Sequence, residues 1–255
     1  MKAFTNCMQR RRWRTSLLAV LPLLGLMSGC VTSMAPGRID AVQPTSSTPR
    51  AGQVYLIRGW GGMFSWGIDE LAQDLTHAGI NSHVFQHDQR DELARTMVER
   101  YRGVRNAEPL CMVAHSAGSD DALYIAGELK KAGVLVDLLI TLDNVDATTV
   151  PLNVRLAHHY WAPGNFGDSN FLRGLPLKAE PGSKGTLVNV NLAEDGRQMV
   201  QPGVSHVTMD KDHLLRPRLV ELVLKTCPTR EMWLARNSAG LLLPPTMSTT
   251  GRERR

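Results

Sequence analysis

The first 30 residues contain none of the chain's 24 acidic residues, although they carry one Lys and four Arg between Lys2 and Arg14. From Cys30 onward, the chain has 24 Lys and Arg and an equal number of Asp and Glu. The formal net charge of +5 therefore belongs to the start of the chain. Once that start is removed the chain is neutral, and no electrostatic argument for a nucleic-acid partner remains.

Cysteine is scarce, with four residues in a chain of 255. Cys7 and Cys30 lie near the start, and no Cys-x-x-Cys pair indicates a metal site. Cys111 and Cys227 are either two buried thiols or one disulfide, because spacing does not decide pairing. A dinucleotide-binding G-x-G-x-x-G is also missing, since Phe64 stands where the last Gly is needed. The sequence predicts no metal and no cofactor.

Long hydrophobic runs are missing as well. The apolar segment 17–27 is shorter than the ~20 residues that a membrane-spanning helix needs. It follows a basic stretch and precedes the small residues Ser28 and Gly29, an order typical of a secretory signal. We expect residues 1–29 to be a signal peptide, with an N-terminal membrane anchor helix as the alternative.

The end of this segment, Leu26-Met27-Ser28-Gly29-Cys30, resembles the lipobox of bacterial lipoproteins. The resemblance implies that Cys30 becomes the acylated first residue of the mature protein. It also implies a lipid-anchored protein of the cell envelope that contacts the membrane and faces the periplasm. Plain secretion with an unmodified Cys30 is the alternative.

The rest of the chain has ordinary globular composition, with 43% hydrophobic and 21% charged residues. Residues 30–50 are rich in Ser, Thr and Pro, and we expect a lipidated N-terminus and a flexible tether. Apolar strand patterns then alternate with helical patterns over residues 51–227, which predicts an α/β domain with a mostly parallel sheet. Residues 228–255 are expected to be a loosely attached tail. The expected strands cover residues 54–57, 83–87, 109–114, 136–142, 154–161 and 186–192.

The segment 111–119 joins a buried strand directly to a helix, with Ser116 at the turn. Small residues, Ala114 and Gly118, stand two positions on either side, as a tight strand-to-helix turn requires. The segment resembles the nucleophile elbow, G-x-S-x-G, of the α/β-hydrolase fold, with Ala114 in place of the first Gly. A Ser that only caps a helix is the alternative. The resemblance implies an α/β-hydrolase fold, with helices on both faces of the sheet.

The same resemblance implies the other parts of the site. The Gly-rich turn after the first strand of the domain supplies Trp60, whose amide, with that of Ala117, forms the oxyanion hole. His206, in a loop before the last helix, is the base, and His213 is the alternative. The acid follows Ser and precedes His in the chain. Asp143, which ends the strand after the elbow helix, is favoured over the alternatives Asp146, Asp168 and Asp195.

Together these residues predict a serine hydrolase that cleaves a carboxylic ester or thioester through a Ser116–His206–Asp143 triad and an acyl-enzyme. An acyltransferase with the same triad is one alternative. A catalytically silent, hydrolase-like lipoprotein that binds an envelope component is another. The partner is expected to be a small-molecule acyl ester or thioester, while its identity and the oligomeric state stay open.

Smaller expectations concern the surroundings of the site. Ser65 stands where an N-cap belongs at the helix that follows the Gly-rich turn. Trp60, Phe64 and Trp66 are expected to pack beneath that helix, with an acyl pocket as the alternative. Residues 163–185 are expected to form a small lid.

Overall fold

The computed structural model describes residues 37–60, 65–146, 149–163 and 174–241. The chain divides into two units, Met1–Ser33 and Met34–Arg255, and every described residue belongs to the second. The signal peptide, Cys30, Phe64, Asp168 and residues 164–173 of the expected lid lie outside the described residues. Among the described helices, none is long and apolar enough to cross a membrane.

Six strands form one sheet in the order β2-β1-β3-β4-β6-β8, and every neighbouring pair is parallel. Two further short strands pair with each other in parallel. Because all six strands run the same way, their carboxyl ends meet at one edge, where the following loops gather. The strands are β1 (Gln53–Ile57), β2 (Asn81–Phe85), β3 (Leu110–His115), β4 (Leu138–Leu142), β5 (Thr149–Val150), β6 (Leu156–Trp161), β7 (Lys178–Ala179) and β8 (Thr186–Asn191).

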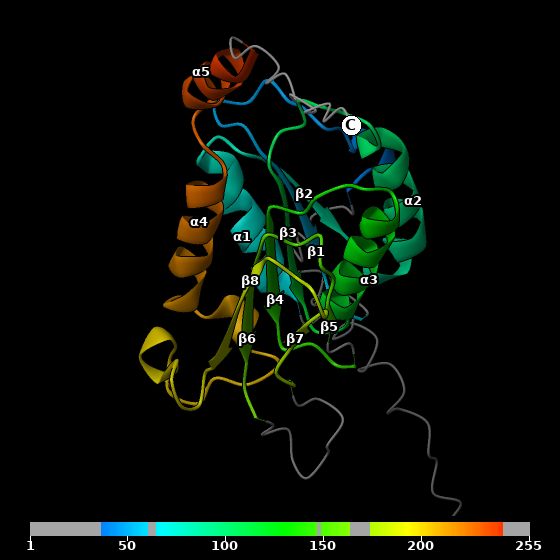
Figure 1. The fold of residues 1–255 in the computed structure, drawn as a ribbon. Helices are drawn as coiled ribbons and strands as arrows, with labels where there is room; N and C mark the ends of the chain where they lie inside the picture. Colours follow the sequence, from blue (N-terminus) through cyan, green and yellow to red (C-terminus); the bar gives the residue numbers. More distant parts are fainter. Residues whose placement is uncertain (1–36, 61–64, 147–148, 164–173, 242–255) are drawn as a thin grey trace, which may run out of the picture. The chain divides into compact units, whose positions relative to one another are not determined.

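Helices cover both faces of the six-stranded sheet (Figure 1). All five residues of β1 are buried, and successive side chains point to opposite faces. Tyr55 and Ile57 join the core under α2 and α3, whereas Val54 and Leu56 join the core under α1 and α4. The helices are α1 (Trp66–His77), α2 (Arg90–Tyr101), α3 (Ala117–Lys131), α4 (Leu215–Thr226) and α5 (Arg230–Leu241), with short 3₁₀ turns at η1 (Ile39–Ala41), η2 (His87–Gln89), η4 (Arg197–Met199) and η5 (Met209–Lys211).

The parallel sheet, the two helical layers and a helix that follows β3 without a loop confirm the expected α/β-hydrolase fold. The boundaries differ slightly, since Val136 and Val154 form an isolated bridge and not parts of β4 and β6. Cys111 and Cys227 are both fully buried and free, with their Sγ atoms 3.7 Å apart.

The flanking segments differ from expectation, because residues 37–50 pack onto the sheet domain and the expected tail begins with α5. The buried carboxylate of Glu108 holds both. It accepts hydrogen bonds from the Ser46 and Gly52 amides, at 2.7 and 2.9 Å, and pairs with the Arg230 guanidinium. The polar composition of residues 37–50 hid this packing, because Glu108 lies 62 residues from Ser46 in the sequence.

Candidate active site

Ser116 sits in the tight turn between β3 and α3, with φ 58° and ψ −132°, a conformation that non-glycine residues rarely adopt. The turn leaves no room for side chains around it. A Cβ on Gly118 would lie 2.5 Å from the Ile57 carbonyl oxygen, and one on Gly59 would lie 2.9 Å from the Ser116 Cβ. These contacts explain why small residues flank Ser116, as the elbow pattern requires.

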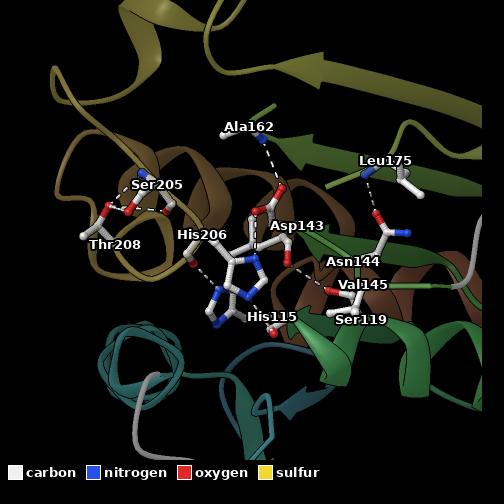
Figure 2. A network of polar contacts seen from close by, with 12 residues as sticks. His115, Ser119, Asp143, Asn144, Val145, Ala162, Leu175, Ser205, His206 and Thr208 are labelled. Atoms are coloured by element: carbon white, nitrogen blue, oxygen red, sulfur yellow. Dashed lines mark hydrogen bonds and ion pairs between the residues drawn. The ribbon is translucent and has the colours of Figure 1, made fainter. Parts of the chain in front are cut away.

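His206 brings the three predicted residues together. Its Nε2 lies 2.8 Å from the Ser116 Oγ, and its Nδ1 lies 2.8 Å from the Asp143 Oδ2. Figure 2 shows the ring directed at the Asp143 carboxylate. Because a carboxylate only accepts, Nδ1 carries the proton and Nε2 is free to accept from the Ser116 hydroxyl. This is the hydrogen-bonded order that activates a serine.

Asp143 follows β4 directly and is fully buried. Its Oδ1 accepts a hydrogen bond from the Ala162 amide at 3.0 Å, which leaves Oδ2 for His206 (Figure 2). Gly174 packs over the same carboxylate, and a Cβ there would lie 1.8 Å from Oδ1. The Ala162 amide and Gly174 thus hold the carboxylate with Oδ2 toward the imidazole.

The alternative residues lie elsewhere. Asp146 is exposed, and its amide hydrogen-bonds to the Asp120 carboxylate. Asp195 and His213 are exposed as well, and Asp168 lies outside the described residues. Of the acids considered, Asp143 is the one that the described structure places against His206.

The structure shows the surroundings of one of the two predicted oxyanion donors, the Ala117 amide. Ala117 is the first residue of α3, so its amide has no acceptor within the helix. Trp60 is the last described residue before the gap at 61–64 in the β1–α1 loop, and the direction of both amides relative to a substrate oxygen stays a prediction. The tryptophans do not pack beneath α1 as expected, because the side chains of Trp60 and Trp66 are 78% and 46% exposed.

The sequence alone did not single out His115, whose buried imidazole lies beside that of His206. The His115 ring lies 5.2 Å from the His206 ring, centroid to centroid, and is fully buried. Burial, followed by the charge of His206, lowers the pKa of His115 to about 3, so this ring stays neutral. The Ser65 hydroxyl makes no cap bond in α1 and lies 2.9 Å from the His115 Nδ1. The one signal in the sequence was their position, since His115 directly precedes Ser116 and Ser65 follows the Gly-rich turn.

Asp210, in the 3₁₀ turn η5 that follows His206, is also buried. Its Oδ2 accepts a hydrogen bond from the Gly67 amide at 2.9 Å, in the first turn of α1. Burial raises the pKa of Asp210 to about 7. This contact fastens the His206 loop to α1. Among the described residues, no group of three His, Cys, Asp or Glu side chains could hold a metal ion.

The sequence matches no protein-family model. A search of curated proteins likewise gives no match. Among solved structures, the chain is similar to Est1E from Butyrivibrio proteoclasticus with ferulic acid bound, at 11% identity over 72% of this chain and 93% of that one, with a TM-score of 0.44.

Two other solved structures are similar to the chain at the same level. The NocB thioesterase domain from the nocardicin cluster is 14% identical over 69% of this chain and 93% of its own, with a TM-score of 0.43. A protein described as an alpha/beta superfamily hydrolase from Xanthomonas campestris pv. campestris is 15% identical, over 68% and 98%, with a TM-score of 0.38. Since these TM-scores are below 0.5, the similarity indicates nothing about activity.

Proposed function

We propose that this protein is a serine hydrolase that cleaves a carboxylic ester or thioester through an acyl-enzyme. The observation that carries the proposal is the single imidazole of His206, which bonds the Ser116 hydroxyl on one side and the buried Asp143 carboxylate on the other. The fold places Ser116 at the carboxyl edge of the sheet, at the N-terminus of α3, where developing negative charge is favoured.

The steps follow from these contacts. The Ser116 Oγ attacks the carbonyl carbon of the substrate while the His206 Nε2 takes the hydroxyl proton. Asp143 keeps the Nδ1 proton in place and stabilises the imidazolium. The amides of Ala117 and Trp60 donate to the oxyanion. The proton on Nε2 then passes to the departing alcohol or thiol, which leaves an acyl group on Ser116, and water activated by His206 releases the acid.

The proposed place of this activity is the cell envelope, with the chain held in a membrane by a lipid on Cys30. The support is the basic start, the short apolar segment and the Leu26–Cys30 sequence. The substrate would then be a small acyl ester or thioester reached from the periplasm.

A fluorophosphonate probe tests the proposed chemistry, because it reacts with an activated serine and needs no knowledge of the substrate. We expect one adduct, at Ser116, in the folded wild type, and none in Ser116→Ala. Ser82→Ala is the matched control, because the Ser82 hydroxyl is bonded to the Ala72 carbonyl, far along the chain from the elbow. An adduct at another residue would refute the proposed nucleophile, and no adduct on folded protein would favour a silent binding protein.

A second measurement separates hydrolysis from acyl transfer. The protein is incubated with an activated ester and with an acyl thioester, with and without added alcohols and amines, and the products are identified by mass spectrometry. The proposal expects the free acid as the main product under all conditions. A dominant ester or amide product would identify an acyltransferase that uses the same Ser116.

A further inference from the structure

Three buried hydrogen bonds connect the Gly59 amide to the backbone of His206 by way of Ser65 and His115. The His115 Nε2 lies 2.7 Å from the His206 carbonyl oxygen. A carbonyl oxygen only accepts, so Nε2 must carry the proton and donate. Since His115 is neutral, its Nδ1 is then without a proton and can only accept.

The remaining directions follow from this one. The Ser65 Oγ lies 2.9 Å from the His115 Nδ1, so the Ser65 hydroxyl donates its proton to that nitrogen. The same Oγ lies 3.0 Å from the Gly59 nitrogen and accepts from its N–H. The direction of each hydrogen bond is therefore defined. Every donor and acceptor of the Ser65 and His115 side chains is used, except for one lone pair of the Ser65 hydroxyl.

The connected residues come from three separate segments, and each stands next to a part of the proposed machinery. Gly59 precedes Trp60, a predicted oxyanion donor, and His115 precedes Ser116. The third segment contains His206 itself, whose main-chain carbonyl accepts the hydrogen bond from His115. The bonds span 6, 50 and 91 residues of sequence. Ser65 and His115 are 2% and 0% exposed, so water does not compete for these bonds.

We propose that Ser65 and His115 are positioning residues that set the distance between the nucleophile, its base and the oxyanion loop. This inference rests on the proposed function. His115 takes no part in proton transfer, because both of its nitrogens are already committed and neither bonds the Ser116 hydroxyl or the Asp143 carboxylate. Its donor fixes the main chain of His206, and that main chain determines whether the His206 ring reaches Ser116 and Asp143 together.

A pair of amide substitutions separates the two bonds of His115. In His115→Gln the amide nitrogen can reach the place of Nε2 and still donate to the His206 carbonyl. In His115→Asn the shorter side chain reaches only toward Ser65, so the His206 carbonyl loses its donor. Ser65→Ala removes the hydroxyl that joins the β1–α1 loop to His115. His83→Gln, on β2, and Ser82→Ala serve as matched controls.

The readout is the second-order rate constant for fluorophosphonate labelling of Ser116, measured beside the thermal unfolding midpoint. A misplacement of ~1 Å can cost about a hundredfold in rate, so we expect Ser65→Ala and His115→Asn to lose about tenfold to a hundredfold. His115→Gln should keep a larger share of the rate than His115→Asn, and the controls should match wild type. Folded variants with lowered midpoints and unchanged rate constants would show a purely structural role and overturn the inference.

The wild-type protein offers a test that does not depend on any variant folding. Imidazole nitrogen resonances report which ring nitrogen is protonated. The hydrogen bonds require opposite tautomers in the two neighbouring rings, with the proton on Nε2 in His115 and on Nδ1 in His206. A His115 protonated at Nδ1 would overturn the inference. Wild type that fails to label at Ser116 would instead refute the proposed function, so the two failures are distinguishable.

Discussion

Ser116 and Asp143 are the two non-glycine residues with positive φ in the described part of the chain, and both hydrogen-bond to the imidazole of His206. Their φ angles are 58° and 50°. Such conformations cost about 1–3 kcal/mol each and persist only where the surrounding structure enforces them. The two strands that end here are neighbours in the sheet, and the Ser116 amide donates to the Leu142 carbonyl at 2.8 Å. The two strained backbone positions are therefore the proposed nucleophile and the proposed acid of the triad.

The strain at Ser116 predicts a difference between two inactive variants. Ser116→Gly and Ser116→Ala should both abolish fluorophosphonate labelling. The glycine variant should be more stable than the alanine variant by about 1 kcal/mol, because glycine adopts this φ without a Cβ clash. Denaturant unfolding of the two proteins measures the difference. An alanine variant of equal or greater stability would show that the turn is not strained.

Gly174 is predicted to be essential for the position of the acid. In Gly174→Ala the new Cβ would meet the Asp143 Oδ1, so the carboxylate must move away from His206. We expect the labelling rate of Ser116 to fall by about a hundredfold, in line with the cost of a ~1 Å misplacement. Gly127→Ala, on α3, has no heavy atom within 4 Å and should keep the rate and gain about 0.5–1 kcal/mol of stability. Equal rates in the two variants would contradict the prediction.

The two candidate acids at the end of β4 are separated by conservative substitution. Asp143→Asn removes the charge that stabilises the imidazolium and favours the wrong tautomer of His206, a change that costs on the order of 10⁴ in turnover in other serine triads. Asp146→Asn should change the turnover little, because Asp146 is exposed. Turnover of an activated ester measures both. A larger loss in Asp146→Asn would place the acid elsewhere.

Asp210 predicts a pH dependence of stability. Burial raises its pKa from 3.8 to about 7, so between these values the folded protein binds more protons than the unfolded chain. The free energy of unfolding contributed by this group therefore falls as pH rises through that window. In Asp210→Asn the free energy of unfolding should fall less with pH, and the variant should be more stable than wild type at pH 8. Each unit of pKa shift corresponds to about 1.4 kcal/mol of this free energy.

Thermal unfolding from pH 4 to pH 8 checks this in both proteins. The asparagine keeps an oxygen that can accept from the Gly67 amide, so the contact with α1 is retained. Parallel pH profiles for the two proteins would show that Asp210 titrates normally.

The lipid anchor is a prediction from sequence alone. Mass spectrometry of the mature protein, purified from membranes of the native host, should find an acylated Cys30 as the first residue. Cys30→Ser should stall processing or release the protein from the membrane. A mature protein that begins at another residue would refute the lipobox assignment.

Local sequence predicted the fold class and Ser116, and the family resemblance of the elbow favoured His206 and Asp143 over their alternatives. The pattern of a buried strand, a small residue, Ser116 and Gly118 is complete within ten residues, and the apolar periods that alternate along the chain identify a parallel sheet. In a parallel sheet, loops after neighbouring strands gather at one edge. Asp143, at the end of the strand after the elbow helix, could therefore be placed near Ser116 before any distance was known.

Only the tertiary structure determined which polar groups hydrogen-bond to one another. His115 bonds residues 50 positions before and 91 positions after it, and Gly174 packs on a carboxylate 31 residues away. No local pattern marks such contacts, because a hydrogen bond or a close approach depends on the separation in space of atoms that the sequence keeps far apart. Propensity and periodicity describe how one segment folds on itself, whereas burial next to a distant segment makes His115 neutral and leaves no room for a Cβ at Gly174.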